Sequence, residues 1–421
     1  MTRLAALREK GFRTVFIGQA VSSLGSALVP VALAFAVLHQ SRSASDLGWV
    51  LASEQAAGLL LFLFGGVIAD RFPRRTVMIV ADSIRAVGEV TLGLLFVLGR
   101  PPIVVIAALA AVQGLAGGVI TPAAMSLTPA VASTDNLQQA NMLGSMASNM
   151  TSVIGPAIGG LLVVTVGGGW AILADGATFA VNVIMLSGLH IKLAPRAEKQ
   201  TMLHELREGW TAFVSRRWYW NLVVCFGLSN FLGGAYLVLG PVTSKRYYDG
   251  AATWAAVITC GAIGGIVGGF ATMRLKPRHP LRVGVYFALM WPLIPLGFAA
   301  RLPTPLLCIL SGLAWLGVIT FNDLLYTTVH KVIPEQIMAR VISYDYFLAF
   351  LAIPLGMILG PPTSDALGLR PTLFAIGVGM LGITSLAALL PSVRNFTVEE
   401  ELAAATLEAT VSETTGPDSH T

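Results

Sequence analysis

Long apolar runs separated by short polar connections dominate this chain. Twelve of these runs are long enough to cross a bilayer as a helix, which takes about 20 residues. They predict transmembrane helices at roughly 12–39, 47–69, 77–98, 102–126, 139–166, 170–191, 218–240, 253–273, 281–299, 305–328, 339–366 and 371–391. The pattern therefore predicts an all-α membrane protein with about twelve transmembrane helices.

The composition excludes several other classes of protein. Of the 421 residues, 55% are hydrophobic and 12% are charged, whereas about a quarter of the residues of a soluble protein are charged. The basic residues lie at the ends of apolar runs and form no aromatic-interleaved patch, so we expect no nucleic-acid partner. The three cysteines lack metal-ligand spacing. No catalytic triad or phosphate loop is present, so we expect no enzyme, no cofactor and no metal.

The distribution of basic residues predicts the orientation in the membrane. With both termini in the cytoplasm, 20 of the 27 Lys and Arg residues lie on the inner side, six lie on the outer side, and Arg85 lies within a helix. Lys and Arg favour the cytoplasmic side of a bilayer. We expect a monomeric multi-pass protein of the inner (plasma) membrane, surrounded by lipid.

The second half of the chain repeats the first. The stretch 269–278 falls where 66–75 would fall after a shift of 203 residues, and Gly356 and Gly360 match Gly155 and Gly159 after a shift of 201. Such internal repeats are typical of transporters built from two related bundles.

This repeat suggests a division of the chain into four parts. The linker is basic and carries apolar residues at helical spacing (Leu203, Leu206, Trp210, Phe213), which predicts an interfacial helix. The tail is acidic and is expected to be disordered apart from a short helix at most. The parts are a six-helix bundle at 1–191, a cytoplasmic linker at 192–217, a second six-helix bundle at 218–391 and the tail at 392–421.

The connection between the second and third predicted helices is the densest group of charges in the chain. It resembles the Gly-x-x-x-Asp-Arg-x-Gly-Arg-Arg loop of the major facilitator superfamily, with Pro73 where that family usually has glycine. An acid there can face the positive end of a helix in the other bundle, and the arginines can hold neighbouring helix ends. The resemblance implies a conformational latch made of Gly66, Asp70, Arg71, Arg74 and Arg75.

Three further stretches resemble one bacterial branch of that superfamily, which contains macrolide-efflux and enterobactin-exporter proteins. They are Phe-x-x-x-Phe-x-Gly-Gln at 12–19, Ala-Asp-x-x-Arg-Ala at 81–86 and Gly-Leu-Arg-Pro at 368–371. The resemblance implies the major facilitator fold, with two six-helix bundles related by pseudo-twofold symmetry that rock about a central cavity.

The fifth predicted helix contains Gly155, Pro156, Gly159 and Gly160, which resemble the Gly-Pro-x-x-Gly-Gly antiporter motif of superfamily exporters. Pro156 removes an intrahelical hydrogen bond, and the glycines admit a closely packed partner, so the helix can bend and slide. The motif favours export over import. The alternative is that it serves only for packing.

The fourth predicted helix departs from the family pattern. Many proton-coupled exporters have an arginine three residues before a Gln-Gly pair; here the pair begins at Gln113 and the corresponding residue is Ala110. Any coupling mechanism in this chain therefore does without that arginine.

Polar residues on faces of apolar helices are candidates for the lining of a cavity. On the fifth helix they step by four, three and four residues from 141 to 152. Serines on the first helix can instead bond back to their own helix. The candidates are Gln19, Asn141, Ser145, Asn322 and Tyr326.

Ionisable residues within the predicted helices are costly and are therefore functional candidates. Glu54 and Asp323 lie well inside their segments and have no cationic neighbour on the same helix. A carboxyl in such a place is suited to bind and release a proton, or to bind the charge of a cationic substrate. We therefore expect proton coupling or substrate charge recognition at Asp323 or Glu54.

The other intramembrane charges have simpler interpretations. Asp82, Arg85 and Glu89 share one helix face, and we expect a local charge ladder with a structural role. For Asp175, a helix cap or contact and a functional role are equally open. Asp345 is expected to be solvated or paired with the arginine loop.

These observations predict a secondary active transporter that exports an amphipathic small molecule, a drug or a secondary metabolite, by proton antiport with alternating access. Its partners would be the substrate, protons and the lipid bilayer. The alternatives are a proton-coupled importer of a small nutrient and a membrane sensor without transport, for which a soluble domain would be the expected mark.

Overall fold

The computed structural model describes residues 5–71, 73–189, 210–211 and 213–403, with the side chains of 62–71, 121–122, 125–126, 335–336 and 339 left out. The first bundle consists of α1 (Lys10–Ser41), α2 (Ala44–Arg71), α3 (Arg74–Leu98), α4 (Ile103–Val131), α5 (Leu137–Thr165) and α6 (Gly168–Ser187). The second consists of α8 (Arg217–Tyr247), α9 (Ala251–Thr272), α10 (Pro280–Ala288), α11 (Leu293–Ala299), α12 (Thr304–Val332), α13 (Glu335–Leu351), α14 (Ile353–Leu367) and α15 (Leu369–Leu389), followed by α16 (Pro391–Arg394).

The predicted all-α class is confirmed, because every one of the twelve apolar segments is largely helical. Ten spans of the described chain are long and apolar enough to cross a membrane. In addition, α2 with 28 residues and α3 with 25 residues are of membrane-spanning length. Two predicted helices are interrupted. The ninth breaks into α10 and α11 before Pro292, and the eleventh breaks into α13 and α14 before Pro354. Proline lacks the N–H that a continuous helix needs.

The chain beyond α15 continues through α16 and a second short helical piece to residue 403, and the sequence predicts no more than a short helix in this tail. Val393 and Phe396 are buried, and the Phe396 ring lies 4.8 Å from that of Trp218 at the start of α8. Trp218 Nε1 donates a hydrogen bond to Glu401 Oε1 at 3.0 Å. The buried side chains of Val393 and Phe396 therefore hold 392–403 against the second bundle. The rest of the tail lies outside the described residues.

The predicted interfacial helix of the linker falls mostly outside the described residues, including Leu203 and Leu206. Its other two apolar residues pack on the second bundle. The rings of Trp210 and Phe213 lie 5.3 Å and 6.5 Å from that of Tyr344 on α13.

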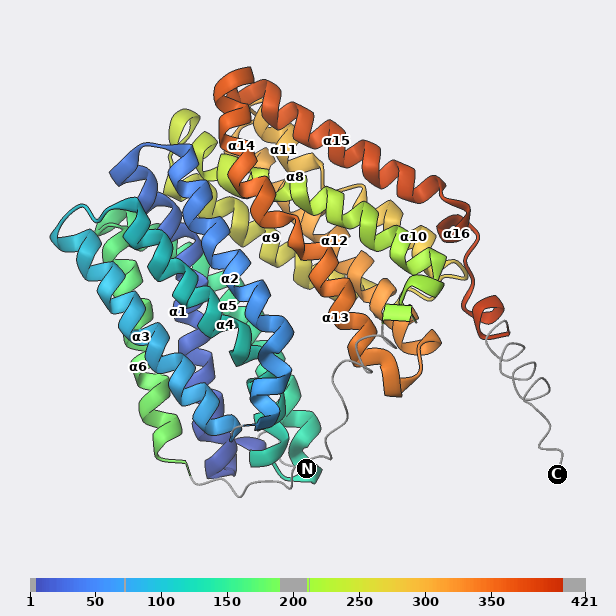
Figure 1. Cartoon of the computed structure of the whole chain (residues 1–421), viewed down its shortest axis with the longest axis horizontal. Helices are drawn as coiled ribbons and strands as arrows, with labels where there is room; N and C mark the ends of the chain where they lie inside the picture. The colour runs from blue at the N-terminus through green and yellow to red at the C-terminus, as the bar shows by residue number, and fades with distance from the viewer. Residues whose placement is uncertain (1–4, 72, 190–209, 212, 404–421) are drawn as a thin grey trace, which may run out of the picture.

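The two bundles contact each other at the end away from the first residues of α1, called here the closed end. Figure 1 shows them close together there and diverging toward the opposite end, called the open end. A Cβ atom on Gly160 of α5 would lie 2.4 Å from the Cβ of Ala255 on α9. A Cβ on Gly48 of α2 would lie 2.4 Å from the carbonyl oxygen of Met357 on α14. Glycine at both places allows the bundles to meet.

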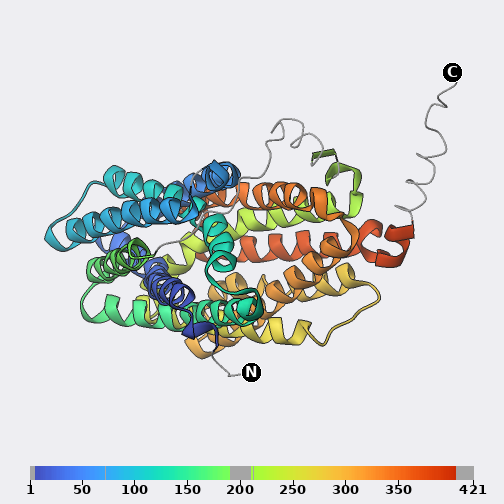
Figure 2. The same ribbon diagram turned by 90° about the horizontal axis from the view of Figure 1, so that it is seen from below.

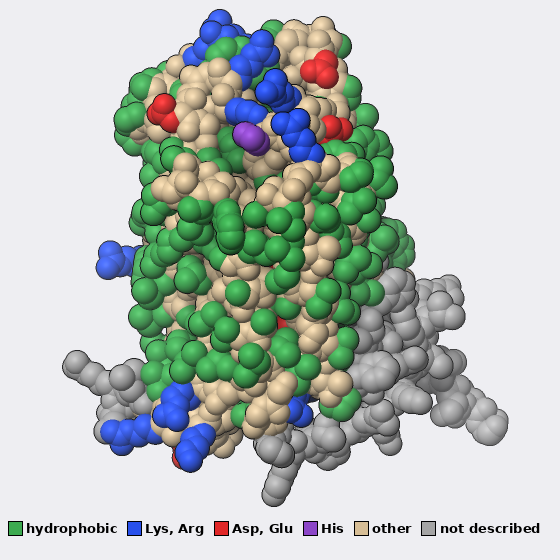
Figure 3. All heavy atoms as spheres, turned by 90° about the vertical axis from the view of Figure 1, so that its left-hand side faces the viewer, with side chains coloured by type: hydrophobic (Ala, Val, Ile, Leu, Met, Phe, Trp, Pro, Cys, Tyr) green, Lys and Arg blue, Asp and Glu red, His purple; other side chains and the backbone are tan. Residues whose placement is uncertain are grey.

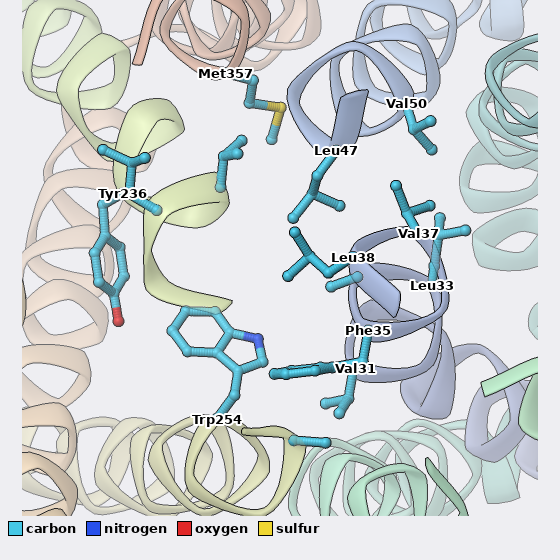
Figure 4. Close-up of a cluster of buried hydrophobic side chains, with 14 of the residues drawn as sticks. Val31, Leu33, Phe35, Val37, Leu38, Leu47, Val50, Tyr236, Trp254 and Met357 are labelled. Carbon is cyan, nitrogen blue, oxygen red and sulfur yellow. The ribbon is translucent and has the colours of Figure 1, made fainter. Parts of the chain in front are cut away.

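Buried apolar side chains fill the closed end. Phe35 and Leu38 of α1 lie beside Trp254 of α9, and Leu47 of α2 lies near Met357 of α14 (Figure 4). Lys245 of α8 adds a hydrogen bond from Nζ to the carbonyl oxygen of Leu38. This packing seals the end of the molecule by the burial of apolar surface from both bundles.

The faces that meet at the closed end are exposed at the open end. Met142 precedes Gly160 by 18 residues on α5, and Met273, at the end of α9, follows Ala255 by 18. Eighteen residues are five helical turns, so each pair shares one face at a separation of about 27 Å. Both methionines are exposed. The bundles therefore enclose a cleft that widens from Gly160 toward Met142 and Met273.

The outer surface fits a bilayer. On the face formed by the first bundle, hydrophobic side chains cover the middle, and Lys and Arg gather toward the two ends (Figure 3). Seen from the open end, the first half of the chain lies beside the second (Figure 2).

Candidate functional site

A cavity of about 700 Å³ opens at the open end of the second bundle. Asp323 is half-buried in its wall, and a Cβ on Gly269 would lie 4.0 Å from Asp323 Oδ2. The lining residues are Gly269, Thr272 and Met273 of the α9 end, and Asp323, Tyr326, Thr327, His330 and Lys331 of α12.

The amphipathic spacing of α12 places these side chains. Asp323, Tyr326 and His330 recur at three to four residues and so share one helix face. The opposite face carries buried residues such as Leu324 and Thr328. The polar cluster around Asp323 faces the cavity because the apolar side chains on the other faces of α12 are buried in the core.

Asp345 does not have the predicted environment. It is neither solvated nor paired with the arginine loop among the described contacts. It is 5% exposed, and its Oδ2 accepts a hydrogen bond from the hydroxyl of Tyr326 at 3.2 Å. Asp345 thus orients a tyrosine that lines the Asp323 cavity.

The face of α5 across the cleft combines polar and apolar side chains. Asn141 and Ser145, predicted to line a cavity, are exposed there. Met142, Met146 and Met150 follow each other at four-residue spacing, and each is more than half exposed. Flexible, polarisable methionines adapt to irregular apolar ligands. We did not predict these methionines as site residues, although their spacing is visible in the sequence.

The remaining predicted lining residues are less accessible. Gln19 and Asn322 are half-buried, and neither is among the residues that form the Asp323 cavity. The hydroxyl of Ser22 donates to the carbonyl oxygen of Gln19 at 3.3 Å. This serine therefore bonds back to its own helix, one of the two interpretations left open by the sequence.

The structure does not bring Glu54 and Asp323 together. Glu54 is half-buried on α2 in the first bundle, where its electrostatic partners are Arg85, Glu89 and Asp175. Asp323 lies in the second bundle against the α9 end. The two candidate coupling carboxyls thus belong to different sites.

Arg85 of α3 lies at the centre of the first bundle. Its Nη2 donates to Ser26 Oγ of α1 at 3.4 Å, and its guanidinium lies 4.0 Å from the ring centre of Phe179 on α6. Gln113 Nε2 of α4 donates to the Arg85 carbonyl oxygen at 3.1 Å. The Arg85 side chain thus contacts α1 and α6, and its backbone carbonyl is bonded from α4.

The predicted charge ladder of Asp82, Arg85 and Glu89 is part of a larger group. Asn182 Nδ2 of α6 donates to Asp82 Oδ2 at 2.7 Å. Asp175 of α6 is completely buried and interacts electrostatically with Arg85. The sequence could not reveal this group, because its members from α2, α3 and α6 are far apart in the chain.

The arginine-rich connection lies at the open end. Arg75 donates from Nε to the carbonyl oxygen of Leu186 at 2.8 Å and from Nη2 to that of Ser187 at 2.5 Å. These carbonyls are at the C-terminus of α6, where the helix dipole favours a cation. Gly66 lies within α2, and the side chains of Asp70 and Arg71 lie outside the described residues, so the role of the latch stays a prediction.

The glycines of the antiporter-like motif have two different partners. Cβ atoms on Gly155 and Gly159 would lie 2.2 Å from Ala27 Cβ and 2.8 Å from the Leu28 carbonyl oxygen, both on α1 of the same bundle. Gly160 instead faces α9 of the other bundle, and Pro156 lies buried between them. The motif therefore connects packing inside the first bundle with the contact between bundles.

Two helical bundles around a cleft that is sealed at one end are the architecture of a membrane transporter. Residues 15–361 match the profile of the Major Facilitator Superfamily, and the chain belongs to this superfamily. Its members are non-enzymatic transporters of small molecules, embedded in a membrane as multi-pass proteins.

Relatives and solved structures agree with this assignment. The chain is 26% identical to the multidrug efflux pump Tap of Mycolicibacterium fortuitum, covering 88% of this chain and 93% of Tap. It is 27% identical to the enterobactin exporter EntS of Shigella boydii, covering 78% and 79%. A bacterial homologue of the lysosomal transporter Spinster, in an inward-facing conformation, has a TM-score of 0.73 at 16% identity, covering 93% and 98%. The nucleoside transporter NupG has a TM-score of 0.68 at 12% identity, covering 90% and 98%.

Proposed function

We propose that this superfamily member exports an amphipathic small molecule, a drug or a secondary metabolite, by proton antiport. The observation that carries the proposal is the cleft, sealed between Gly160 and Ala255 and open between Met142 and Met273. A transporter works by alternating access when such a seal forms first at one end and then at the other.

In this proposal the open end faces the cytoplasm, because most Lys and Arg residues then lie on the inner side. Substrate enters the cleft from the cytoplasm or the inner leaflet. Rocking of the bundles then opens the Gly160 seam outward, and the substrate leaves the cell.

The lining of the cleft supports an amphipathic substrate. Met142, Met146 and Met273 offer adaptable apolar contacts. Asp323 and Tyr326 offer a carboxylate and a hydroxyl on the facing wall. The hollow beside Asp323 is wide open, so in this proposal it forms one wall of the substrate site and does not enclose the substrate by itself.

The named relatives also support export. Tap is a multidrug efflux pump and EntS is an enterobactin exporter. Their identity to this chain, 26% and 27%, leaves the substrate to be identified by experiment.

The test is efflux of a panel of lipophilic cations and macrolides from energised cells that express the chain, with and without a protonophore. We expect efflux of at least one compound, its loss with the protonophore, and strong impairment in Asp323→Asn. Asp135→Asn, an exposed acid before α5, is the matched control and should leave efflux unchanged.

Other outcomes would reject parts of the proposal. Protonophore-sensitive efflux that persists in Asp323→Asn would remove this residue from coupling and bring Glu54→Gln forward. Uptake of a nutrient by the same cells, without efflux of any compound, would establish the importer instead.

A further inference from the structure

A second cavity, of about 570 Å³, lies at the closed end, where the two bundles meet. The first bundle supplies residues of α1, the ends of α3 and α5 and the start of α6, and the second supplies Lys245 of α8 and Ala251, the first residue of α9. Figure 3 shows a histidine among several Lys and Arg side chains at this end of the molecule. The Asp323 cavity lies at the opposite end.

The charged or titratable side chains that line this cavity are all basic. They are His39 of α1, Arg100 just after α3, and Lys245, and no Asp or Glu is among the described residues of the lining. Arg42 interacts electrostatically with Lys245 and adds a further positive charge. Asp249, an acid close to Lys245 along the chain, is exposed and lies outside the lining. Basic groups gathered in one cavity repel each other and attract an anion.

The basic side chains retain hydrogen-bond donors for a ligand. Lys245 donates to the carbonyl oxygen of Leu38, and an ammonium group has three donors, so two remain. Gln40 donates from Nε2 to the carbonyl oxygen of Pro101. This bond ties the turn that carries Arg100 to α1. Arg100 is exposed, and its guanidinium presents a planar fork of donors that matches phosphate oxygens.

Two helix N-termini add to the positive potential of the cavity. Its lining includes Gly168 at the start of α6, after the N-cap Gly167, and Ala251 at the start of α9, after the N-cap Gly250. Neither N-cap makes a side-chain hydrogen bond. The first N–H groups of a helix lack intrahelical partners and form the positive end of the helix dipole. Both N-termini therefore favour the same anion as the basic side chains.

We propose that this cavity is a binding site for a phosphate group, held by His39, Arg100 and Lys245. Arginine binds phosphate oxygens in a bidentate manner, and lysine adds a point charge. Val164 and Trp170, which also line the cavity, are more than half exposed and can contact acyl chains. The headgroup of an anionic phospholipid therefore fits the site. Free phosphate offers the same oxygens without the chains, and binding measurements distinguish the two sources.

The site is complete only while the closed end is sealed. His39 and Arg100 belong to the first bundle, and Lys245 belongs to the second. When the bundles separate here, Lys245 moves away from the other two groups and the phosphate loses a cation. A ligand that binds one conformation better stabilises that conformation. A bound phosphate thus keeps the closed end sealed, whereas the basic groups repel one another across the contact when it is absent.

The first experiment titrates the detergent-solubilised full chain with phosphatidylglycerol and counts bound lipid by native mass spectrometry. Phosphatidylcholine with the same acyl chains is the control lipid, because its choline group cancels the phosphate charge. We expect the chain to retain phosphatidylglycerol preferentially. Binding should weaken roughly tenfold or more in Arg100→Gln and in Lys245→Gln, since each loses a charge-assisted hydrogen bond. Arg246→Gln removes the same charge from an exposed neighbour outside the lining and should bind as the wild type does.

Competition with inorganic phosphate identifies the source of the ligand. Displacement of phosphatidylglycerol would assign the site to free phosphate, and lipid that resists displacement would assign it to a phospholipid headgroup. Equal retention of the two lipids, or equal binding by Arg100→Gln and Arg246→Gln, would overturn the site. If Lys245→Gln does not fold, because it also loses the bond to Leu38, the exposed Arg100→Gln decides alone.

The second experiment measures the conformation with spin labels on Met142→Cys and Met273→Cys, in a protein without the native cysteines. Phosphatidylglycerol should raise the fraction of long distances between the labels relative to phosphatidylcholine, and Arg100→Gln should abolish this difference. Equal distance distributions in the two lipids would overturn the link between the site and the conformation. Neither measurement needs a transported substrate, so rejection of the proposed export would leave this site standing, and loss of this site would leave export standing.

Discussion

The Cβ atom of any side chain at Gly160 would lie 2.4 Å from the Cβ of Ala255, on the opposite bundle. Carbon atoms make favourable contacts only at about 3.5–4.0 Å. The two bundles can therefore pack this closely at the closed end only because residue 160 has no Cβ atom. Because α5 and α9 carry Met142 and Met273 on the same two faces, we expect a looser seam at Gly160 to bring these two methionines closer together at the other end.

Gly160→Ala should shift the population toward the conformation in which the closed end is open. The shift can be measured in a background without the three native cysteines, with Met142→Cys and Met273→Cys added. A disulfide requires the two Cα atoms to approach within about 7 Å. We expect little disulfide in the glycine protein and a clearly faster reaction with Gly160→Ala.

Gly117→Ala is the matched control, because a Cβ there meets no atom within 4 Å. Equal disulfide rates for Gly160→Ala and Gly117→Ala would show that the seam does not govern the cleft. Reduction of the disulfide should also restore efflux that the cross-link has stopped.

Arg75→Ala should lower the stability of the first bundle, because it leaves the carbonyl groups of Leu186 and Ser187 without their cationic donor. Hydrogen bonds from charged groups contribute about 1.5–3 kcal/mol each when buried, and half exposure reduces this to a total of about 1–2 kcal/mol. Thermal unfolding of the detergent-solubilised protein measures the loss. The exposed Arg13→Ala should unfold at the wild-type temperature, and an equal effect of both changes would contradict the assigned contact.

Glu9 should make the connection between α4 and α5 sensitive to acid. Its carboxylate accepts hydrogen bonds from the Ser133 N–H at 2.8 Å, the Ser133 hydroxyl at 2.6 Å and Asn136 Nδ2 at 2.7 Å. The Ser133 hydroxyl, followed by Asn136, lowers the pKa of Glu9 below its ordinary 4.5. A lowered pKa gives stability that is complete above the unfolded-state value and is lost as the pH falls through the folded-state value.

Glu9→Gln should therefore be less stable than the wild type at pH 7, and the difference should shrink once the pH falls below about 4.5. Hydrogen exchange of the Ser133 amide at the two pH values reports this locally. A difference between variant and wild type that persisted at low pH would exclude the charge of Glu9 as its cause.

The sequence was a good guide to the fold because apolar runs of membrane length have few alternative structures. It was less informative about where individual helices end or break, because proline and local packing determine those positions. The apolar run predicted a helix at roughly 218–240, but α8 continues past Pro241 to Tyr247. The broken ninth and eleventh helices depend on how Pro292 and Pro354 are packed.

For the site, the sequence identified Asp323 and its polar neighbours, because α12 is amphipathic by itself. It could not show the group around Arg85. Asp175 reaches Arg85 only because α6 packs on α3, and Glu54 only because α2 joins the same bundle. Such contacts depend on helix packing, which the spacing within one helix does not encode.

The ordered start of the tail offers a final test, because it should stabilise the second bundle. Phe396 is 7% exposed against Trp218, and its carbonyl oxygen lies 3.1 Å from His279 Nδ1 before α10. Loss of a buried phenylalanine costs about 3 kcal/mol or more. Phe396→Ala and truncation after Arg394 should both lower the unfolding temperature, whereas truncation after residue 403 should leave it unchanged. If all three proteins unfolded at the wild-type temperature, the contact between 395–403 and α8 would contribute nothing to the stability of the folded bundle.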